Sequence, residues 1–292
     1  MITMRTRVLR LCAAAALAGA AFGGVPAAQA EDGNWYIGAT MPLMFIDDSK
    51  AISEGSFTLP DPRTGQPATT DYRAQVETSH DTGFKLGGML GYEFGDGLRV
   101  EGELFFARAD VSTLTHSSIT VPALSLTLQD EVAIPVTGSG EQLGAMVNVW
   151  YDIETDDAWT PFIGGGLGLI RIDQSDLKYD TGAVAGAVAT HLKLLGAQQA
   201  ALAMGLPPPQ EVDPVQLPPG LVPSISSADT ALAWQIGMGV GYALSETATL
   251  QFGYRLQALN GLNFRGSNAM ASVNAETDLR IHFLEIGIRQ RF

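Results

Sequence analysis

Cysteine is almost absent from this chain, and so are long apolar runs. The single cysteine, Cys12, lies in an apolar N-terminal stretch, so the rest of the chain has no disulfide and no thiol chemistry. After residue 30 no stretch has the roughly 20 consecutive apolar residues that a membrane-spanning helix needs. If the chain crosses a membrane, it must do so as a closed barrel of strands, because only closure pairs every backbone group.

Basic residues are also scarce. The sequence has 17 Lys and Arg against 31 Asp and Glu, and its formal net charge is −14. Residues 1–30 hold three of the basic residues and none of the acidic ones, so the remainder carries −17. This balance argues against nucleic acid as a partner, and against an anionic lipid headgroup as the main one.

The N-terminal stretch has the layout of a secretory signal peptide. Its positive region holds three arginines, namely Arg5, Arg7 and Arg10. An alanine-rich apolar run follows from Leu11 to Val25, and Ala28-Gln29-Ala30 supplies the small-x-small cleavage pattern. The run is too short to be a membrane anchor. We therefore expect residues 1–30 to be removed and residues 31–292 to form the mature protein.

Apolar residues alternate with small or polar residues in eight segments of the mature chain. The segments lie at about 35–45, 84–94, 98–106, 143–153, 163–169, 232–244, 250–256 and 284–292. Very short connections alternate strictly with long ones. The short connections are 95–97, 154–158 and 245–247; the long ones are about 48–80, 109–140, 174–229 and 259–276. This pattern predicts an all-β fold, an eight-stranded antiparallel up-and-down transmembrane β-barrel with short periplasmic turns and long extracellular loops.

The two faces of the segments distinguish a membrane barrel from a soluble ligand-binding barrel. One face carries Gly, Glu, Arg and Gln, which cannot line an apolar ligand cavity, and the other carries Leu, Val, Ile, Phe, Tyr and Trp. An eight-stranded barrel has room inside only for side chains. Glycines and paired charges are therefore expected inside, and the bulky apolar face toward lipid. Aromatic residues near the segment ends predict an interfacial girdle: Trp35, Tyr92, Phe94, Tyr151, Trp159, Tyr242 and Phe292.

Four motifs of these segments resemble a known family. They are Asn34-Trp-Tyr-Ile-Gly38, Met146-Val-Asn-Val-Trp-Tyr-Asp152, Thr160-Pro-Phe-Ile-Gly-Gly-Gly-Leu-Gly168 and Glu285-Ile-Gly-Ile-Arg-Gln-Arg-Phe292. Together they resemble the opacity-protein-like surface-antigen family of outer-membrane barrels, relatives of the OmpA-type transmembrane domain. The resemblance covers the strands and not the long loops. It implies an outer-membrane location in a Gram-negative bacterium and a terminal aromatic assembly signal at Phe292, although Gln290 departs from the usual pattern. It does not fix an activity.

Charged residues share the inward phase of the predicted strands. We expect Glu101, Glu103, Arg255, Glu285 and Arg289 to form a lumen charge network, with Glu93, Lys85, Arg99 and Arg291 on the same side. A charge in a narrow lumen must be paired or hydrated. Two interpretations remain open: a network of ion pairs and water that plugs the barrel, or a narrow gated pore whose pairs exchange partners.

Catalysis is the hypothesis that the sequence supports least. The four histidines are His80, His116, His191 and His282. His80 precedes Asp81 and His116 precedes Ser117, but no nucleophile-elbow or metal-ligand spacing appears. A His–Ser or His–Asp contact at the outer rim would revive catalysis. We expect no catalytic residue, no cofactor and no metal; the paired aspartates at 47–48 and 156–157 lack calcium-loop spacing.

The long segment 174–229 is the most unusual part of the sequence. Ala183 to Met204 is alanine-rich and free of proline, which predicts a helix or helical hairpin. Pro207 to Gly220 is proline-rich and should be extended or disordered. The segment is either displayed to a partner or a variable insertion. In the second long connection, Ile119 to Val136 also alternates and could extend the neighbouring strands as a hairpin.

The sequence therefore predicts a non-enzymatic integral outer-membrane barrel with a structural or surface-antigen role. Its expected partners are outer-membrane lipids, the outer-membrane assembly machinery and an extracellular partner that the loops would bind. The alternative function is a narrow conduit for small solutes or lipid-like molecules.

Overall fold

The computed structural model describes residues 33–60, 66–122, 126–129, 132–179, 182–215, 225–267 and 271–292. The predicted signal peptide 1–30, with Cys12, lies outside these ranges. The described elements follow one another as β1 (Gly33–Thr40), β2 (Leu43–Ile46), β3 (Ser49–Pro60), β4 (Pro67–His80), β5 (Gly83–Phe94), β6 (Leu98–Val121), β7 (Leu126–Leu128), β8 (Val132–Asp152), β9 (Trp159–Tyr179), α2 (Gly182–Ala203), β10 (Ile225–Ala243), β11 (Ala248–Ser267) and β12 (Ala271–Arg291).

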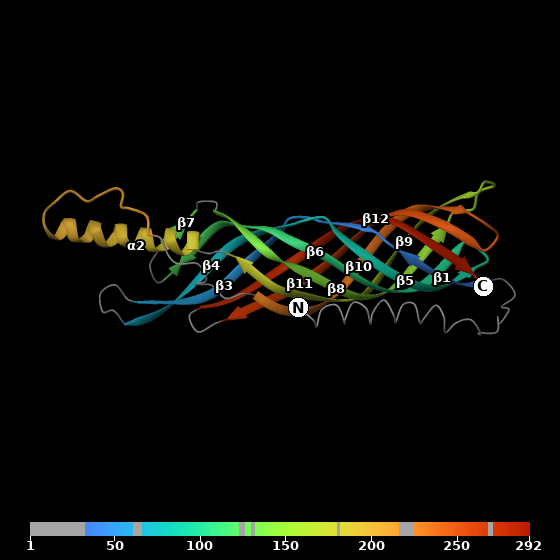
Figure 1. Cartoon of the computed structure of the whole chain (residues 1–292), viewed down its shortest axis with the longest axis horizontal. Coiled ribbons are helices and arrows are strands. Elements are labelled where there is room, and N and C mark those ends of the chain that lie inside the picture. The colour runs from blue at the N-terminus through green and yellow to red at the C-terminus, as the bar shows by residue number, and fades with distance from the viewer. Residues whose placement is uncertain are drawn as a thin grey trace.

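These strands form a closed antiparallel barrel (Figure 1). Its wall has eight strand positions, here called staves, and each stave is one strand or several strands in succession. β1, β2 and β3 follow one another along the first stave, and β4 and β5 along the second. β6, β8, β9, β10, β11 and β12 each make one stave, and β7 is a short strand added to β6. The last strand, β12, pairs with β1, β2 and β3, so the sheet closes on itself. The predicted eight-stranded up-and-down barrel is confirmed.

The first two staves are interrupted at residues 41–42, 47–48 and 81–82. Backbone hydrogen bonds bridge each interruption. Met41 N donates to Ile286 O at 2.9 Å, Asp47 N to Arg280 O at 3.0 Å, and Asp81 N donates to the carbonyl of residue 110 at 2.9 Å. The first two staves therefore remain hydrogen-bonded to neighbouring strands at all three interruptions.

The extent of the strands differs from the sequence prediction. The segments predicted as loops at 48–80, 109–140 and 259–276 are paired strand over most of their length. The suggested hairpin extension at 119–136 is borne out by its described residues, which form the end of β6, β7 and the start of β8 and pair with one another. The loop prediction was wrong because these extensions are rich in Ser, Thr and charged residues, so their outward face is polar rather than lipid-like. Inside, small apolar clusters such as Ala74, Val76, Ile119 and Val121 hold them together.

A belt of exposed apolar side chains surrounds the half of the barrel that carries the short turns. It includes Leu104, Val147, Leu167, Ile236 and Leu284, each more than half exposed. At the turn end the aromatic girdle is in place, with ring centroids 5.3 Å apart for Trp35–Tyr92, 4.9 Å for Tyr92–Phe94 and 4.6 Å for Trp159–Tyr242. The belt identifies the part of the barrel that lies in lipid.

The long connection 174–229 contains the helix α2, as predicted. Figure 1 shows α2 at the end of the barrel opposite the C-terminus, projecting past the strand ends. Among the described residues, the structure has no helix whose length and apolarity would let it cross a membrane.

Candidate functional site

The charged side chains of the barrel interior come from strands whose inward phase is set by the alternation. β6 contributes Glu101 and Glu103, β11 contributes Arg255, and β12 contributes Glu285 and Arg289. Each of these five residues is at most 7% exposed. All five residues predicted for the lumen network therefore lie inside the barrel.

Arg255 is the centre of an upper charge cluster. Its Nη1 donates to Glu103 Oε2 at 2.9 Å, and its Nη2 donates to Glu285 Oε1 at 2.8 Å. Lys85 Nζ lies 2.6 Å from Glu103 Oε1, so this carboxylate is held between two cations. A buried charge alone is costly, and these pairings offset much of that cost.

Glu101 is held mainly by neutral donors. Its carboxylate accepts hydrogen bonds from Tyr36 Oη at 2.8 Å, Asn148 Nδ2 at 3.0 Å and Trp150 Nε1 at 2.8 Å. Arg99 Nη1 lies 3.9 Å from the same carboxylate. Both oxygens of Glu101 are therefore fixed in position by groups from β1, β6 and β8.

Glycines of β9 make room for the large inward side chains of β8. A side chain at Gly164 would collide with Trp150, and one at Gly166 would collide with Asn148. The Trp150 ring then reaches the lumen, where Arg255 Cζ lies 4.8 Å from its centroid. The alternating glycines 164, 166 and 168 thus let β8 supply the hydrogen-bond donors for the acidic side chains.

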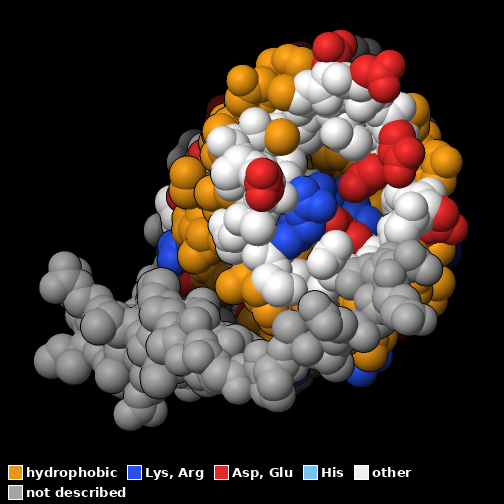
Figure 2. All heavy atoms as spheres, turned by 90° about the vertical axis from the view of Figure 1, so that its right-hand side faces the viewer, with side chains coloured by type: hydrophobic (Ala, Val, Ile, Leu, Met, Phe, Trp, Pro, Cys, Tyr) orange, Lys and Arg blue, Asp and Glu red, His pale blue; other side chains and the backbone are white. Residues whose placement is uncertain are grey.

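A second charge cluster lies at the periplasmic mouth. Arg289 Nη1 is 2.9 Å from Glu93 and 3.4 Å from Asp152, while Arg99 Nη2 is 2.8 Å from Asp152. Arg291 reaches Glu93 at 3.6 Å. Arg99 also lies 3.9 Å from the Glu101 carboxylate, and Asn148 donates to both Glu101 and Glu103. The two clusters therefore form one network. Figure 2 looks into this mouth and shows acidic and basic side chains filling its centre inside a largely apolar outer surface.

The charges of this network balance. The cations are Lys85, Arg99, Arg255, Arg289 and Arg291, and the carboxylates are Glu93, Glu101, Glu103, Asp152 and Glu285. Equal numbers of opposite charges in contact leave the lumen without a strong field of either sign. The arrangement can hold the wall together, and it does not favour the passage of one sign of ion.

Above the charges, toward the extracellular side, the lumen is filled mainly by apolar side chains, with the buried Gln142 and Gln257 among them. A packed cluster of buried side chains includes Phe105, Met146, Ile170, Leu259 and Phe283, each at most 3% exposed. The expectation that glycines and charges fill the interior is therefore correct only for the periplasmic half. Ile170, Leu259 and Phe283 were missed because they continue the inward phase just beyond the segments predicted as strands, whereas Phe105 and Met146 lie within those segments on the inward phase.

Lys85 lies at the junction of the two layers. Its ammonium group is 4.0 Å from the Phe105 ring centroid and 4.9 Å from that of Phe283, on the apolar side, and it pairs with Glu103 below. Cation–π contact is favourable where water is excluded. The polar and apolar layers are thus packed directly against one another.

Sequence reasoning missed several residues of the network. They are Tyr36, Asn148, Trp150, Asp152 and Gln235. The signal that would have found them is the phase, since each one alternates with the lipid-facing residues. Their roles depend on the register across strands, which places Glu101 opposite Asn148 and brings Gln235 Nε2 within 2.6 Å of Asn148 Oδ1.

One histidine makes the contact that would revive a catalytic interpretation. His282 Nε2 lies 3.1 Å from Asp47 Oδ1, and its Nδ1 lies 2.6 Å from Tyr254 Oη. Asp47, His282 and Tyr254 lie on the outer face at the extracellular edge of the apolar belt. The hydroxyl beside the histidine is the phenol of Tyr254 rather than a serine hydroxyl. His80, His116 and His191 lie in β4, β6 and α2. Within the described residues, no cluster of three or more His, Cys, Asp or Glu side chains could hold a metal ion.

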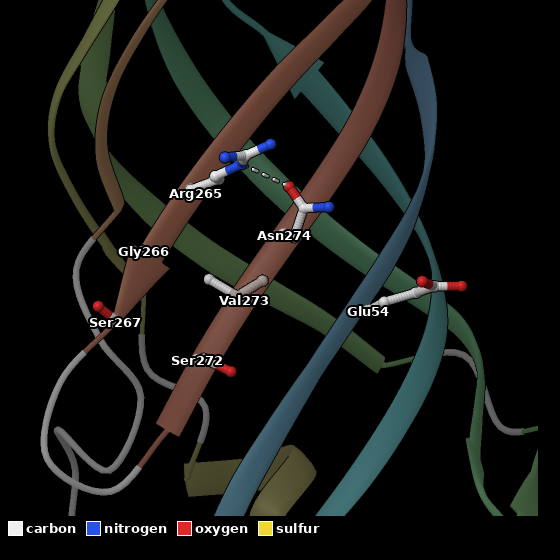
Figure 3. A pocket seen from close by; sticks show the side chains of 7 residues that line it. All are labelled: Glu54, Arg265, Gly266, Ser267, Ser272, Val273 and Asn274. Carbon is white, nitrogen blue, oxygen red and sulfur yellow. Dashed lines mark hydrogen bonds between the residues drawn. The ribbon is translucent and has the colours of Figure 1, made fainter.

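An open pocket of about 570 Å³ lies near the outer ends of β3, β11 and β12 (Figure 3). Glu54, Arg265 and Asn274 supply its longest polar side chains, and Arg265 Nε donates to Asn274 Oδ1 at 3.4 Å. Glu54 also pairs with Arg73 at 3.4 Å, with both side chains more than half exposed. Small-molecule sites are usually enclosed and mostly apolar. The lumen network is therefore the stronger candidate site.

The model of the outer membrane protein beta-barrel domain family matches residues 13–276 of the sequence. The chain belongs to this family. An "Outer membrane protein" of Gluconacetobacter diazotrophicus is 32% identical over 119 residues, which cover 38% of this chain and 28% of that protein. The matched part thus spans less than a third of the relative's length.

Two solved structures are also similar to this outer-membrane barrel. Neisserial surface protein A (NspA) is 16% identical, with 90% of this chain and 100% of that chain covered and a TM-score of 0.42. OprG from Pseudomonas aeruginosa is 16% identical, with 89% and 96% covered and a TM-score of 0.42. The family assignment places the protein in the outer membrane, as the sequence predicted.

Proposed function

We propose that this outer-membrane barrel is a structural protein that closes its own lumen and displays its extracellular half for envelope integrity or for partner binding. The observation that carries the proposal is the filling of the lumen by two layers. Balanced ion pairs fill the periplasmic half, and the apolar cluster around Phe105 and Phe283 fills the half above it. An ion would have to separate buried pairs and then enter an apolar layer, and both steps are costly.

The proposal includes three partners. Outer-membrane lipids cover the apolar belt, and the strand extensions with α2 face an extracellular partner. The assembly machinery would recognise the C-terminal end of β12, where Phe292 is 45% exposed on the lipid side. Gln290, two residues earlier, points outward and donates to Thr247 Oγ1 at 2.8 Å, so its polar group has a partner in the short turn before β11.

We propose that the barrel is not an enzyme. Both ring nitrogens of His282 are engaged, one by Asp47 and one by Tyr254, which supports a role in joining the start of β3 to β11 and β12. In the triads of acyl transfer a carboxylate and a serine hydroxyl occupy the two ring nitrogens, whereas here the hydroxyl is the phenol of Tyr254. Hydrolysis of a phospholipid or peptide by the wild type, lost in His282→Ala, would contradict this part of the proposal.

A conduit is the second candidate, and buried polar atoms favour it. Both amide atoms of Gln257, the hydroxyl of Thr40 and Glu285 Oε2 are buried without a hydrogen-bond partner among the described residues. Such groups need water in a stable interior. A continuous chain of water molecules along the lumen would give a narrow conduit its path.

Single-channel conductance of the refolded mature protein in a planar bilayer separates the two candidates. Folding is first confirmed by heat-modifiable gel mobility. We expect silence or rare, very small openings, because the paired charges and the apolar layer close the lumen. Steady openings that shift in Glu101→Gln or Arg289→Gln, and not in Glu276→Gln on the exposed face of β12, would contradict the sealed barrel and favour the conduit.

A further inference from the structure

The helix α2 is attached to the barrel along only part of its length. Leu192, at its middle, packs against the buried cluster of Ala74, Val76, Ile119 and Val121 in β4 and β6. The following residues to Ala203 extend past the strand ends (Figure 1). At about 1.5 Å per residue, they carry the end of α2 roughly 16 Å beyond Leu192.

A return segment fastens itself to this projecting helix. Gln198 Nε2 donates to Pro209 O at 3.0 Å, Lys193 Nζ donates to Asp213 O at 3.1 Å, and Val215 N donates to Thr190 Oγ1 at 2.7 Å. Four prolines in this return segment (residues 204–215) remove backbone donors and favour an extended conformation. α2 and residues 204–215 therefore form one unit, here named the outer hairpin (residues 182–215).

The backbone at the end of the outer hairpin is closed by a capping motif. Gly205 adopts a φ of +68°, which favours glycine. Leu206 N donates to Ala201 O at 2.8 Å, and Gly205 N donates to Leu202 O at 3.1 Å, which is the Schellman pattern. Most of the last carbonyls of α2 are thus satisfied without water.

The tip of the outer hairpin is apolar and uncharged. Leu202, Met204 and Leu206 are 65%, 67% and 54% exposed. The sequence has no charged residue between Lys193 and Glu211. Adjacent exposed aliphatic side chains of this kind mark a surface that contacts a protein or a membrane.

We propose that this tip inserts into a lipid bilayer that faces the cell, distinct from the membrane that holds the barrel. Entry into lipid requires side chains without charge and backbone groups that are already paired, and the capped tip meets both requirements. Protein interfaces are enriched in aromatic residues, arginine and methionine, and the tip has only Met204 of these, with no aromatic or arginine anchor. The outer hairpin projects away from the apolar belt, so its own membrane is not within reach. The inference rests on the proposed display function, because it needs the hairpin to face outward.

Vesicle co-flotation tests the proposal. The refolded mature chain, held in phosphatidylcholine nanodiscs, is mixed with large protein-free phosphatidylcholine vesicles and centrifuged through a density step. We expect the wild type to float with the vesicles. The triple variant Leu202→Ser, Met204→Ser, Leu206→Ser should be captured at least about tenfold less, since it loses three apolar side chains. Ile52→Ser, an exposed apolar residue on β3 away from the tip, is the matched control and should float like the wild type.

A fluorescent label at the tip tests insertion directly. Met204→Cys adds one thiol to a mature chain that is expected to have none, and an environment-sensitive dye on it should shift to the blue and resist an aqueous quencher when vesicles are added. Equal capture of the triple variant, absence of the blue shift, or capture only by vesicles that contain proteins would each overturn the proposal. None of these outcomes bears on lumen conductance, so failure of this inference is distinguishable from failure of the sealed-barrel function.

Discussion

At the scale of single residues, the interior is organised by how many partners each charge has. Glu103 contacts two cations and an amide, since Lys85, Arg255 and Asn148 all lie within 3.1 Å of its carboxylate. Removing one partner of a buried pair leaves the other charge without compensation, which costs more than the pair contributes. Glu103 is therefore the position where a small chemical change should have the largest effect on stability.

The substitution Glu103→Gln should lower the free energy of unfolding by about 3–5 kcal/mol, because it leaves Lys85 and Arg255 with an excess of buried positive charge. The measurement is urea unfolding in lipid vesicles, followed by tryptophan fluorescence and heat-modifiable mobility. Glu276→Gln removes the same charge at an exposed position of β12 and should change stability by less than about 0.5 kcal/mol. Similar losses in both variants would show that the buried pairs are not a special source of stability.

At the scale of elements, the strands of the barrel exceed what a membrane requires. β6 has 24 residues and β8, β9 and β12 have 21 each, whereas a spanning strand needs about 9–11. The surplus forms an extracellular extension with its own small core. Two histidines belong to it: burial lowers the pKa of His116 to about 4, and it lowers the pKa of His80 to about 4 although Asp48 and Asp81 oppose this.

The stability of the extension should therefore depend on pH. An unfolded histidine titrates near pH 6.5, so between about pH 6.5 and 4 the open form binds a proton that the folded form does not. Stability is fully present above pH 6.5 and is lost as the pH falls toward 4. Hydrogen exchange of a peptide covering 111–121, corrected for intrinsic rates, should show more frequent opening at pH 5 than at pH 7.5.

His116→Gln should weaken this pH dependence, while His191→Gln on α2 should leave it unchanged. An unaltered pH response in His116→Gln would mean that another group opens the extension.

At the scale of the whole molecule, the barrel is a tube with two layers inside and two zones outside. The charged interior lies inside the apolar belt. The apolar interior begins within the upper part of the belt, where Phe105 and Phe283 neighbour the belt residues Leu104 and Leu284, and it continues toward the extracellular extension. The C-terminus ends in the girdle at the periplasmic edge, where Phe292 N donates to Trp35 O at 3.0 Å. This hydrogen bond uses only the backbone of Phe292. The Phe292 side chain is therefore free for recognition before the barrel closes.

Phe292→Ala should reduce the outer-membrane level of the protein in cells several-fold while leaving the yield of folding into detergent unchanged, because the backbone bond to Trp35 is kept. Trp35→Ala is the matched control: its side chain is similarly exposed and lies in the same girdle, but it is not at the chain end. Quantitative immunoblotting of membrane fractions gives the comparison. Equal outer-membrane levels of Phe292→Ala and wild type would show that the assembly signal lies elsewhere.

The sequence alone determined the fold, the lipid-facing side and the inward placement of Glu101, Glu103, Arg255, Glu285 and Arg289. Period-two alternation fixes which side of a strand each residue faces, and this relation does not depend on partners. The tertiary structure decided which charges meet, because Asn148 reaches Glu101 only through the register of β6 and β8. It also decided that the interior above Lys85 is apolar and that the strands run far past the membrane. Those features depend on pairing between distant segments. Outside 119–136, the polar outer faces of these segments leave little periodic signal in the sequence.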